Sequence, residues 1–507
     1  MRKTMLNARV NVIFYFLTLI LSFFSRKIFL DMLGADFIGL TSTLQNILCY
    51  INIAELGIST AIGYLLYKPI FDSDKQTINE IISVLGYIYS WLGKLILALG
   101  IAVSLFFPLI FPNTVFELPL IYFAFFSFLT SSLIGYFCNY KQTLLGADQR
   151  NYEVIIYYKG GDILKTIIQI SLAYYTQSYY LWVFIELLFG ILYSIILNWR
   201  IAKIYPWLQS EIKEGRRLLQ KYPAVISQTK KLFVHRISAT VQYWTVPILI
   251  YSFASLQMVA YYGNYTIITD KLSQFVNGFF ESPSAGVGNL IAEGNKNKIM
   301  GIFWELLSLR YFTGATIGFA IYRTIEPFIT LWLGEQYLLG NVILILIILN
   351  IIIGYTRGGI MQFVNGYGLF YDIWAAIAEI IINLSVAIGL GSIYGLPGVL
   401  MGGITSQLLI VNIWKPIFLY TKGFKEPVIS YWLNLAKILV VLIIPAFVVA
   451  MAIDHLLPLT TTSYPEWALY AFVNTAAYAI LAFSLLYTFS KGFRALVQRL
   501  LSKFQHK

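Results

Sequence analysis

The residues best suited to chemistry in this sequence are cations placed inside long apolar stretches. Arg26 and Lys27 lie side by side within the apolar stretch 10–33. A cation at the centre of a bilayer costs roughly 2.5–3.5 kcal/mol on insertion scales, so it usually faces a water-filled cavity or an anion. Alternatively, both side chains lie near the end of this stretch and extend to the lipid headgroups.

Further cations lie in later apolar stretches, and together with the first pair they predict an anion-binding cavity. They are Lys159, Lys165, Arg236, Lys271 and Arg310. Arg binds phosphate through paired hydrogen bonds and Lys acts as a point charge, so a phosphate-bearing ligand is expected. The competing interpretation is ion pairing, because Asp162 is three residues from both Lys159 and Lys165, and Asp270 precedes Lys271. Glu55 is a further acid within an apolar stretch.

The composition indicates a membrane protein with many spans. Of 507 residues, 58% are hydrophobic and only 12% are charged. This is far above the apolar content of soluble chains. The net charge of +12 does not indicate nucleic-acid binding, because the Lys and Arg residues gather in alternate loops and in both tails. That asymmetry places both termini in the cytoplasm.

An all-α polytopic fold follows, because backbone polar groups inside a bilayer must be satisfied within helices. We expect about 14 spans of sufficient length. They are 10–33, 38–66, 80–111, 117–140, 153–175, 180–199, 232–254, 258–282, 300–323, 338–356, 371–393, 397–414, 430–453 and 467–489. A weak repeat at an offset of about 220 residues predicts two six-helix bundles of equal orientation plus two C-terminal helices.

Four regions are predicted from this pattern. They are an N-terminal lobe (1–204), a basic cytoplasmic linker (205–230), a C-terminal lobe (231–422), and two additional helices with a basic tail (423–507). The linker mixes Trp207 and leucines with Lys and Arg. That composition fits an amphipathic helix on an anionic membrane surface, or a plain solvated connector.

Enzyme motifs are absent from the sequence. There is no GxxxxGK[ST] phosphate loop, no HExxH and no GxSxG. The three histidines, His235, His455 and His506, are too scattered to suggest a metal centre. Transport, rather than catalysis, is therefore the expected activity.

The N-terminal region resembles a known family. The cation in the first span, the linker Leu33-Gly-Ala-Asp-Phe-Ile-Gly39, and the segments Ala54-Glu-Leu-Gly-Ile-Ser59 and Tyr67-Lys-Pro69 are similar to Wzx-type O-antigen or capsule flippases. These belong to the polysaccharide-transporter branch of the multidrug/oligosaccharidyl-lipid/polysaccharide (MOP) flippase superfamily. The order and spacing of the segments carry the resemblance.

The resemblance implies a function. The protein would move an undecaprenyl-diphosphate-linked glycan repeat unit from the inner to the outer leaflet of a bacterial cytoplasmic membrane by alternating access. Arg26 and its cationic neighbours would hold the diphosphate, and glycan polymerases and other assembly proteins would be partners. The alternatives are a multidrug or organic-cation exporter of the same superfamily and a non-transporting scaffold in a glycan-assembly complex.

The resemblance also implies a coupling-ion site. Glu379 and Asn383 share one helix face, and Thr405, Ser406 and Gln242 offer further oxygens. This set is similar to the sodium site of some superfamily members, although a Glu replaces a shorter acid and Gln242 replaces a carboxylate. Glu379 could instead carry a proton, or the membrane potential alone could drive transport.

Overall fold

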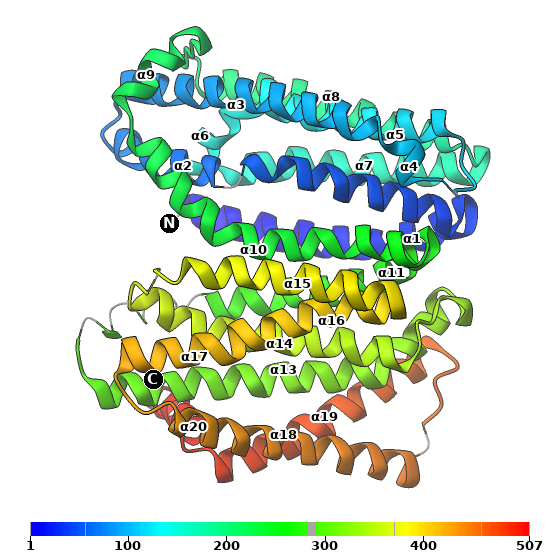
Figure 1. The fold of residues 1–507 in the computed structure, drawn as a ribbon, viewed down its shortest axis with the longest axis vertical. Coiled ribbons are helices and arrows are strands. Elements are labelled where there is room, and N and C mark those ends of the chain that lie inside the picture. Colours follow the sequence, from blue (N-terminus) through cyan, green and yellow to red (C-terminus); the bar gives the residue numbers. More distant parts are fainter. Residues whose placement is uncertain are drawn as a thin grey trace. The chain divides into compact units, whose positions relative to one another are not determined.

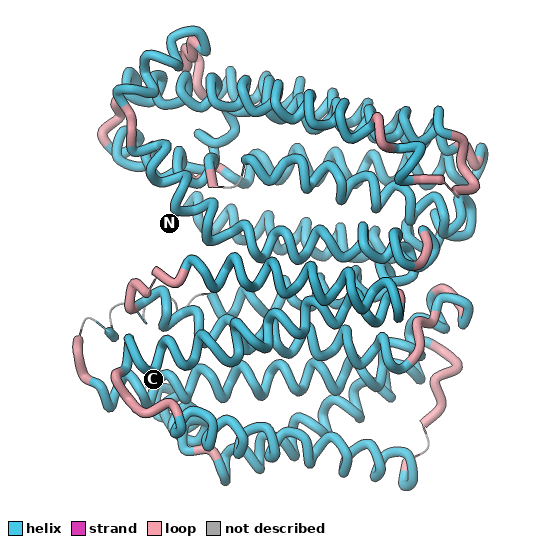
Figure 2. The backbone as a smooth tube through the Cα atoms, viewed as in Figure 1, coloured by secondary structure: helices cyan, strands magenta, loops and turns pink. Residues whose placement is uncertain are grey.

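In the computed structural model, the regular elements among the described residues are all helices, joined by loops, which confirms the all-α prediction (Figure 2). The described residues are 2–55, 57–112, 114–281, 287, 290–291, 293–369, 371–457 and 459–505; the side chains of some, including Arg236 and Gln242, are not described. The chain divides into two compact units, Met1–Ala260 and Tyr261–Lys507.

The first unit is built from long helices that run side by side (Figure 1). They are α1 (Arg2–Ile51), α2 (Ile58–Phe71), α3 (Lys75–Ser104), α5 (Leu118–Phe137), α7 (Asn151–Thr176), α8 (Tyr179–Ile204) and α10 (Ala224–Phe253). Short segments complete the unit: η1 (Asn52–Glu55), α4 (Phe107–Ile110), η2 (Asn139–Lys141), α6 (Gln142–Ala147), η3 (Ile212–Glu214) and α9 (Gly215–Lys221). The helix α11 (Leu256–Glu281) begins here and continues into the second unit.

Two glycines interrupt the helices of the first two predicted spans. Gly34 has the non-helical angles φ 83° and ψ 159°, and it separates two helical segments within α1, at the predicted break between spans 10–33 and 38–66. Gly57 has φ 91°, a conformation that costs other residues energy, and it separates η1 from α2. The predicted span 38–66 is therefore the second half of α1 followed by a broken segment around Glu55.

The second unit is organised around the long helix α13 (Lys296–Trp332), which packs on α14 (Asn341–Gly366), α19 (Tyr464–Phe489) and α20 (Lys491–Gln505). Its other helices are α15 (Ile373–Tyr394), α16 (Leu396–Ser406), α17 (Lys415–Phe418) and α18 (Ile429–Leu456), with η4 (Glu335–Tyr337) and two π-helical turns, η5 (Gln407–Trp414) and η6 (Leu419–Phe424). An aromatic cluster fixes its core, where the ring of Phe303 lies 5.2 Å from that of Phe363 and 5.1 Å from that of Phe424.

The protein is a multi-pass membrane protein. Within the described residues, 9 helices are long and apolar enough to cross a bilayer. They are Arg9–Ile51, Lys75–Ser104, Leu118–Phe137, Tyr179–Ile204, Asn341–Gly366, Ile373–Tyr394, Leu396–Phe424, Ile429–Leu456 and Tyr464–Phe489. The helices α7, α10, α11 and α13 coincide with four further predicted spans. The total of about 14 spans stays a prediction.

The boundary between the compact units differs from the predicted boundary between the lobes. The helix α10 follows the basic linker, yet it packs against α1 and α2 in the first unit. The predicted lobes assigned this helix to the C-terminal half, because the weak repeat put six spans on each side of the basic segment. The predicted lobe boundaries stay a prediction.

The basic linker docks on the end of α3. The backbone N–H of Glu211 donates to the Ser83 hydroxyl at 2.9 Å, and the N–H of Gln209 donates to the Asn79 side chain at 3.0 Å. Gly215 fits so closely that a Cβ there would lie 2.3 Å from the Cβ of Tyr87. The hydrogen bond to Glu80 raises the pKa of the Lys221 ammonium. The linker is thus a docked element of the first unit.

Candidate functional site

Arg310 is a buried cation in the middle of α13. The residue is only 4% exposed to solvent. Nη1 donates to the Tyr355 carbonyl at 3.2 Å, and Nη2 donates to the Phe280 carbonyl at 3.3 Å. The guanidinium carbon lies 4.4 Å from the centre of the Phe280 ring, within the range of a cation–π contact. Main-chain dipoles and a ring face therefore surround this charge.

Two adjacent glycines on α14 make room for the Arg310 side chain. A Cβ on Gly358 would lie 2.3 Å from Nη1 of Arg310, and a Cβ on Gly359 would lie 3.0 Å from its Cδ. The sequence alone did not mark this Gly-Gly pair. Two adjacent glycines can signal space for a bulky side chain on a neighbouring helix, but only once it is known that α13 and α14 pack together.

Arg310 keeps its charge without a carboxylate. Across the described parts of the chain, no Asp or Glu lies within ion-pair distance of its guanidinium. Its two hydrogen bonds use two of the five N–H donors that a guanidinium carries. The remaining donors and the net charge are suited to an anion, and a buried cation of this kind is the expected signature of a functional site.

Arg26, in the first unit, also donates a hydrogen bond to a main-chain carbonyl. Its Nη2 donates to the carbonyl of Ala260 on α11 at 2.7 Å, and its side chain is half-buried. Lys27, the next residue on α1, is exposed. The adjacent cations therefore have different environments, and Arg26 is the one held against another helix.

The two lysines of α7 also have different environments. Lys165 lies between two carboxylates, 2.8 Å from Asp162 and 2.9 Å from Glu186. Its charge is balanced within the unit, so ion pairing is the interpretation that its geometry favours. Lys159 is half-buried, and its ammonium lies 5.5 Å from the centre of the Tyr158 ring.

The remaining predicted cations are only partly described. Arg236 lies in α10, but its side chain is outside the described part of the structure, as is that of Gln242. Asp270 and Lys271 are neighbours on α11 in the second unit, and both are half-buried with polar interactions of their own. Their proposed roles stay predictions.

Glu55 is held by hydroxyl groups from three elements. Its carboxylate accepts hydrogen bonds from Tyr89 of α3 at 2.6 Å, Tyr136 of α5 at 2.9 Å and Ser59 of α2 at 3.2 Å. The Tyr136 hydroxyl also lies 3.2 Å from Oδ1 of Asn52. The sequence marked Glu55, but it could not assign these tyrosines, because they reach the acid only through helix packing.

Glu379 has a counter-charge that the sequence analysis missed. Its carboxylate is 3.0 Å from Nη1 of Arg357, and the residue is 3% exposed. The predicted span 338–356 put Arg357 in a cytoplasmic loop. That assignment is wrong, because α14 continues to Gly366 and carries Arg357 well inside the helix.

The other described residues of the predicted coupling site lie on α15 and at the end of α16. Asn383 is buried on the same face of α15 as Glu379, as the spacing predicted. Thr405 is half-buried at the end of α16, next to Ser406, whose hydroxyl donates to the Gly403 carbonyl at 3.1 Å. An ion site among these oxygens stays a prediction, and a sodium ion there would compete with Arg357 for Glu379.

Comparisons with known proteins give the fold a name. No protein-family model and no curated protein matches the sequence. A solved structure of the lipid II flippase MurJ in an inward closed conformation aligns with a TM-score of 0.65 at 16% identity, covering 94% of this chain and 98% of that one. The chain has the MOP-superfamily transporter fold.

A second solved structure agrees. An inward-facing multidrug-resistance MATE transporter of the MOP superfamily aligns with a TM-score of 0.60 at 14% identity, covering 78% of this chain and 93% of that one. These MOP-fold neighbours are a flippase and a transporter, not enzymes. At such low identity the likeness establishes the MOP fold and leaves the substrate open.

Proposed function

We propose that this protein is a flippase for an undecaprenyl-diphosphate-linked oligosaccharide repeat unit. It would move that unit from the inner to the outer leaflet of a bacterial cytoplasmic membrane, in the assembly of O-antigen, capsule or exopolysaccharide. The observation that carries the proposal is Arg310, a buried guanidinium held by two carbonyls. The structural likeness to a lipid II flippase supports it.

The charge of Arg310 fits a diphosphate better than it fits a neutral or cationic substrate. A guanidinium offers parallel N–H donors that match two phosphate oxygens, and such charge-assisted bonds are about twice as strong as neutral ones. Inside the bilayer the attraction is screened less than in water. A diphosphate would therefore find at Arg310 the counter-charge that the described carboxylates do not supply.

Arg26 supplies a second guanidinium in the first unit, bonded to the Ala260 carbonyl at 2.7 Å. In a MOP-type cycle the two halves of the fold alternate in exposing a central cavity to each side of the membrane. We propose that Arg26 in the first unit, like Arg310 in the second, is a binding residue for the diphosphate. The sugars would enter the cavity, and the polyprenyl chain would remain among the lipids.

Glu379 is our proposal for the residue that couples transport to an ion. Its carboxylate already forms an ion pair with Arg357 at 3.0 Å. Release of Arg357 would leave a buried carboxylate that must take up a proton or a sodium ion, because an unpaired buried charge is costly. Asn383 and Thr405 would provide neutral oxygens, and Gln242 is a further candidate.

Export of organic cations is the second candidate function, and one observation favours it. Glu55 is an intramembrane acid surrounded by the hydroxyls of Tyr89 and Tyr136, an environment that could accept a cation or a proton. The MATE transporter with the same fold agrees with this alternative. The cationic residues count against it, because a cation exporter is expected to have an acidic lining.

The test is the leaflet distribution of the lipid-linked glycan in cells that lack the protein. Wild-type protein, Arg310→Met and Arg323→Met would each be reintroduced, and an impermeant sugar-oxidising reagent would report glycan on the outer face. Arg323 is a matched control on the same helix, because it already pairs with Asp454 and with Asn474 at 3.0 Å.

We expect the wild type and Arg323→Met to restore outer-face glycan and Arg310→Met to fail. If deletion leaves the distribution unchanged but increases sensitivity to cationic drugs, the exporter is correct. If deletion changes neither, the protein does not transport, and the scaffold alternative takes its place.

A further inference from the structure

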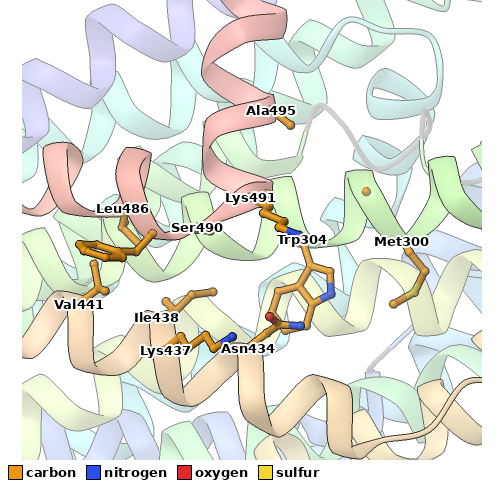
Figure 3. Close-up of a pocket in the computed structure, with 13 residues that line it drawn as sticks. Met300, Trp304, Asn434, Lys437, Ile438, Val441, Leu486, Ser490, Lys491 and Ala495 are labelled. Carbon is orange, nitrogen blue, oxygen red and sulfur yellow. The ribbon is translucent and has the colours of Figure 1, made fainter.

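A pocket of about 570 Å³ opens in the second unit where α13, α18, α19 and α20 meet. Figure 3 shows the side chains of Trp304, Asn434, Lys437 and Lys491 gathered around the same space. Apolar side chains line the remainder, including Ile438 and Val441 from α18 and Leu486 from α19. The pocket therefore combines two ammonium groups with an apolar wall.

The cations near this pocket fall into two classes. Arg494 is occupied, since its Nε donates to the Tyr487 carbonyl at 2.9 Å, at the end of α19. Arg499 is occupied as well, 2.6 Å from the Glu305 carboxylate. Lys437 and Lys491 have no ion-pair or hydrogen-bond partner among the described residues. The two unmatched charges are the two that line the pocket.

The position of the pocket suits the membrane surface. Lys491 begins α20, directly after the span Tyr464–Phe489, and Lys437 lies about 12 Å along α18 from its first residue. The aliphatic part of a lysine side chain can lie in the apolar layer while its ammonium group reaches the headgroups. The Lys and Arg pattern of the sequence predicts that this end faces the cytoplasm.

We propose that this pocket binds the phosphate of an acidic phospholipid from the cytoplasmic leaflet. Lys437 and Lys491 would hold the phosphate as point charges. Asn434 donates one N–H to the Ser430 carbonyl at 2.9 Å and has a second N–H for a phosphate oxygen. Ile438, Val441 and Leu486 would contact the upper part of an acyl chain.

The chemistry of the lining favours a lipid over a soluble phosphate compound. A free phosphate ion would use the ammonium groups but would leave the apolar wall facing water. Trp304 also lines the pocket, and Trp is enriched at the headgroup boundary of membrane proteins. A lipid satisfies both sides of the pocket.

Native mass spectrometry of the full chain in detergent tests this. Dioleoylphosphatidylglycerol is titrated against the wild type, the double variant Lys437→Gln/Lys491→Gln, and the control Lys296→Gln/Lys422→Gln, which removes two exposed lysines elsewhere in the unit. We expect the first lipid to bind roughly fivefold more weakly for each pocket lysine removed, about 25-fold in the double variant. Dioleoylphosphatidylcholine should bind the wild type and the double variant alike.

A second measurement separates the lipid from free phosphate and reads out the site directly. Phosphatidylglycerol brominated on its acyl chains should quench wild-type tryptophan fluorescence more than it quenches Trp304→Phe. Adding inorganic phosphate that carries the same total charge as the lipid should leave that difference in quenching unchanged. Equal lipid binding by both double variants, or full displacement of the lipid by inorganic phosphate, would overturn the proposal.

Discussion

Gly358 and Arg310 occupy complementary positions on facing helices: a Cβ on Gly358 would lie 2.3 Å from Nη1 of Arg310. The atom in the way is the end of a long side chain, so the guanidinium rather than the backbone would move. We expect Gly358→Ala to reduce transport of the lipid-linked glycan severalfold, because the guanidinium leaves the Tyr355 and Phe280 carbonyls. Outer-face glycan in complemented cells measures this.

Gly354→Ala is the matched control for that change. Gly354 lies one turn earlier on α14, and a Cβ there would meet nothing within 4 Å. It should leave both transport and thermal stability unchanged. Equal transport by the two variants would show that the position of the Arg310 guanidinium does not matter.

Arg310→Met should lose transport without losing stability. The Met side chain has no charge, so it avoids the desolvation cost that a buried cation carries. We expect a melting temperature in detergent equal to or above that of the wild type. Arg310→Lys keeps the charge but lacks the planar guanidinium that can form two parallel hydrogen bonds, so it should transport weakly. A large drop in melting temperature for Arg310→Met would instead indicate a structural role.

Tyr89→Phe should destabilise the first unit through Glu55. The carboxylate loses its 2.6 Å donor, and a hydrogen bond to a charged group inside a membrane protein is worth about 1–2 kcal/mol. A double-mutant cycle with Glu55→Gln checks the cause, because the same change should cost less once the acid is neutral. Strict additivity of the two changes in unfolding free energy would contradict the contact.

The Glu379–Arg357 pair predicts a sodium effect that depends on the Arg. In the wild type the guanidinium already balances the carboxylate at 3.0 Å. In Arg357→Gln the buried carboxylate needs a new cation, so sodium should raise the melting temperature more than an equal concentration of N-methylglucamine does. If sodium stabilises the wild type and the variant equally, the ion binds elsewhere. Glu379→Gln/Arg357→Gln is the control that should respond to neither cation.

Gly215→Ala should loosen the docked linker. The new Cβ would lie 2.3 Å from the Cβ of Tyr87 and 2.7 Å from the Ser83 carbonyl oxygen. Overpacking of this kind typically costs about 1–3 kcal/mol. Trypsin should then cut faster after Arg216 and Arg217, next to the new clash. Gly146→Ala, which meets nothing within 4 Å, should be cut at the wild-type rate.

The sequence was most informative where hydropathy alone determines the outcome. Long apolar stretches predicted the helices, because no other regular structure satisfies the backbone within one segment of lipid-exposed chain. Spacing placed Glu379 and Asn383 on one buried face, as the structure has them. Helix ends were less readable, since polar residues inside α14 looked like a loop and put Arg357 beyond the predicted end of the helix.

Side-chain partners could not be read from the sequence, because they depend on which helices touch. Lys165 and Arg310 are both cations in apolar stretches, and in the sequence only the nearby Asp162 distinguishes Lys165. Packing gives Lys165 two carboxylates and gives Arg310 carbonyls and a ring. The tyrosines around Glu55 come from α3 and α5, and nothing in the spacing of those helices connects them to the acid.

The carbonyl contacts of Arg310 have a consequence for the speed of exchange. An arginine bound to a carboxylate must break that pair before it can accept a phosphate, and the displaced acid must then find another cation. Arg310 has no such competitor to expel among the described residues, because peptide carbonyls can keep their bonds to it while its other N–H groups engage a ligand. Capture and release of the anion that we propose for this residue would therefore require no rearrangement of charge among the described residues.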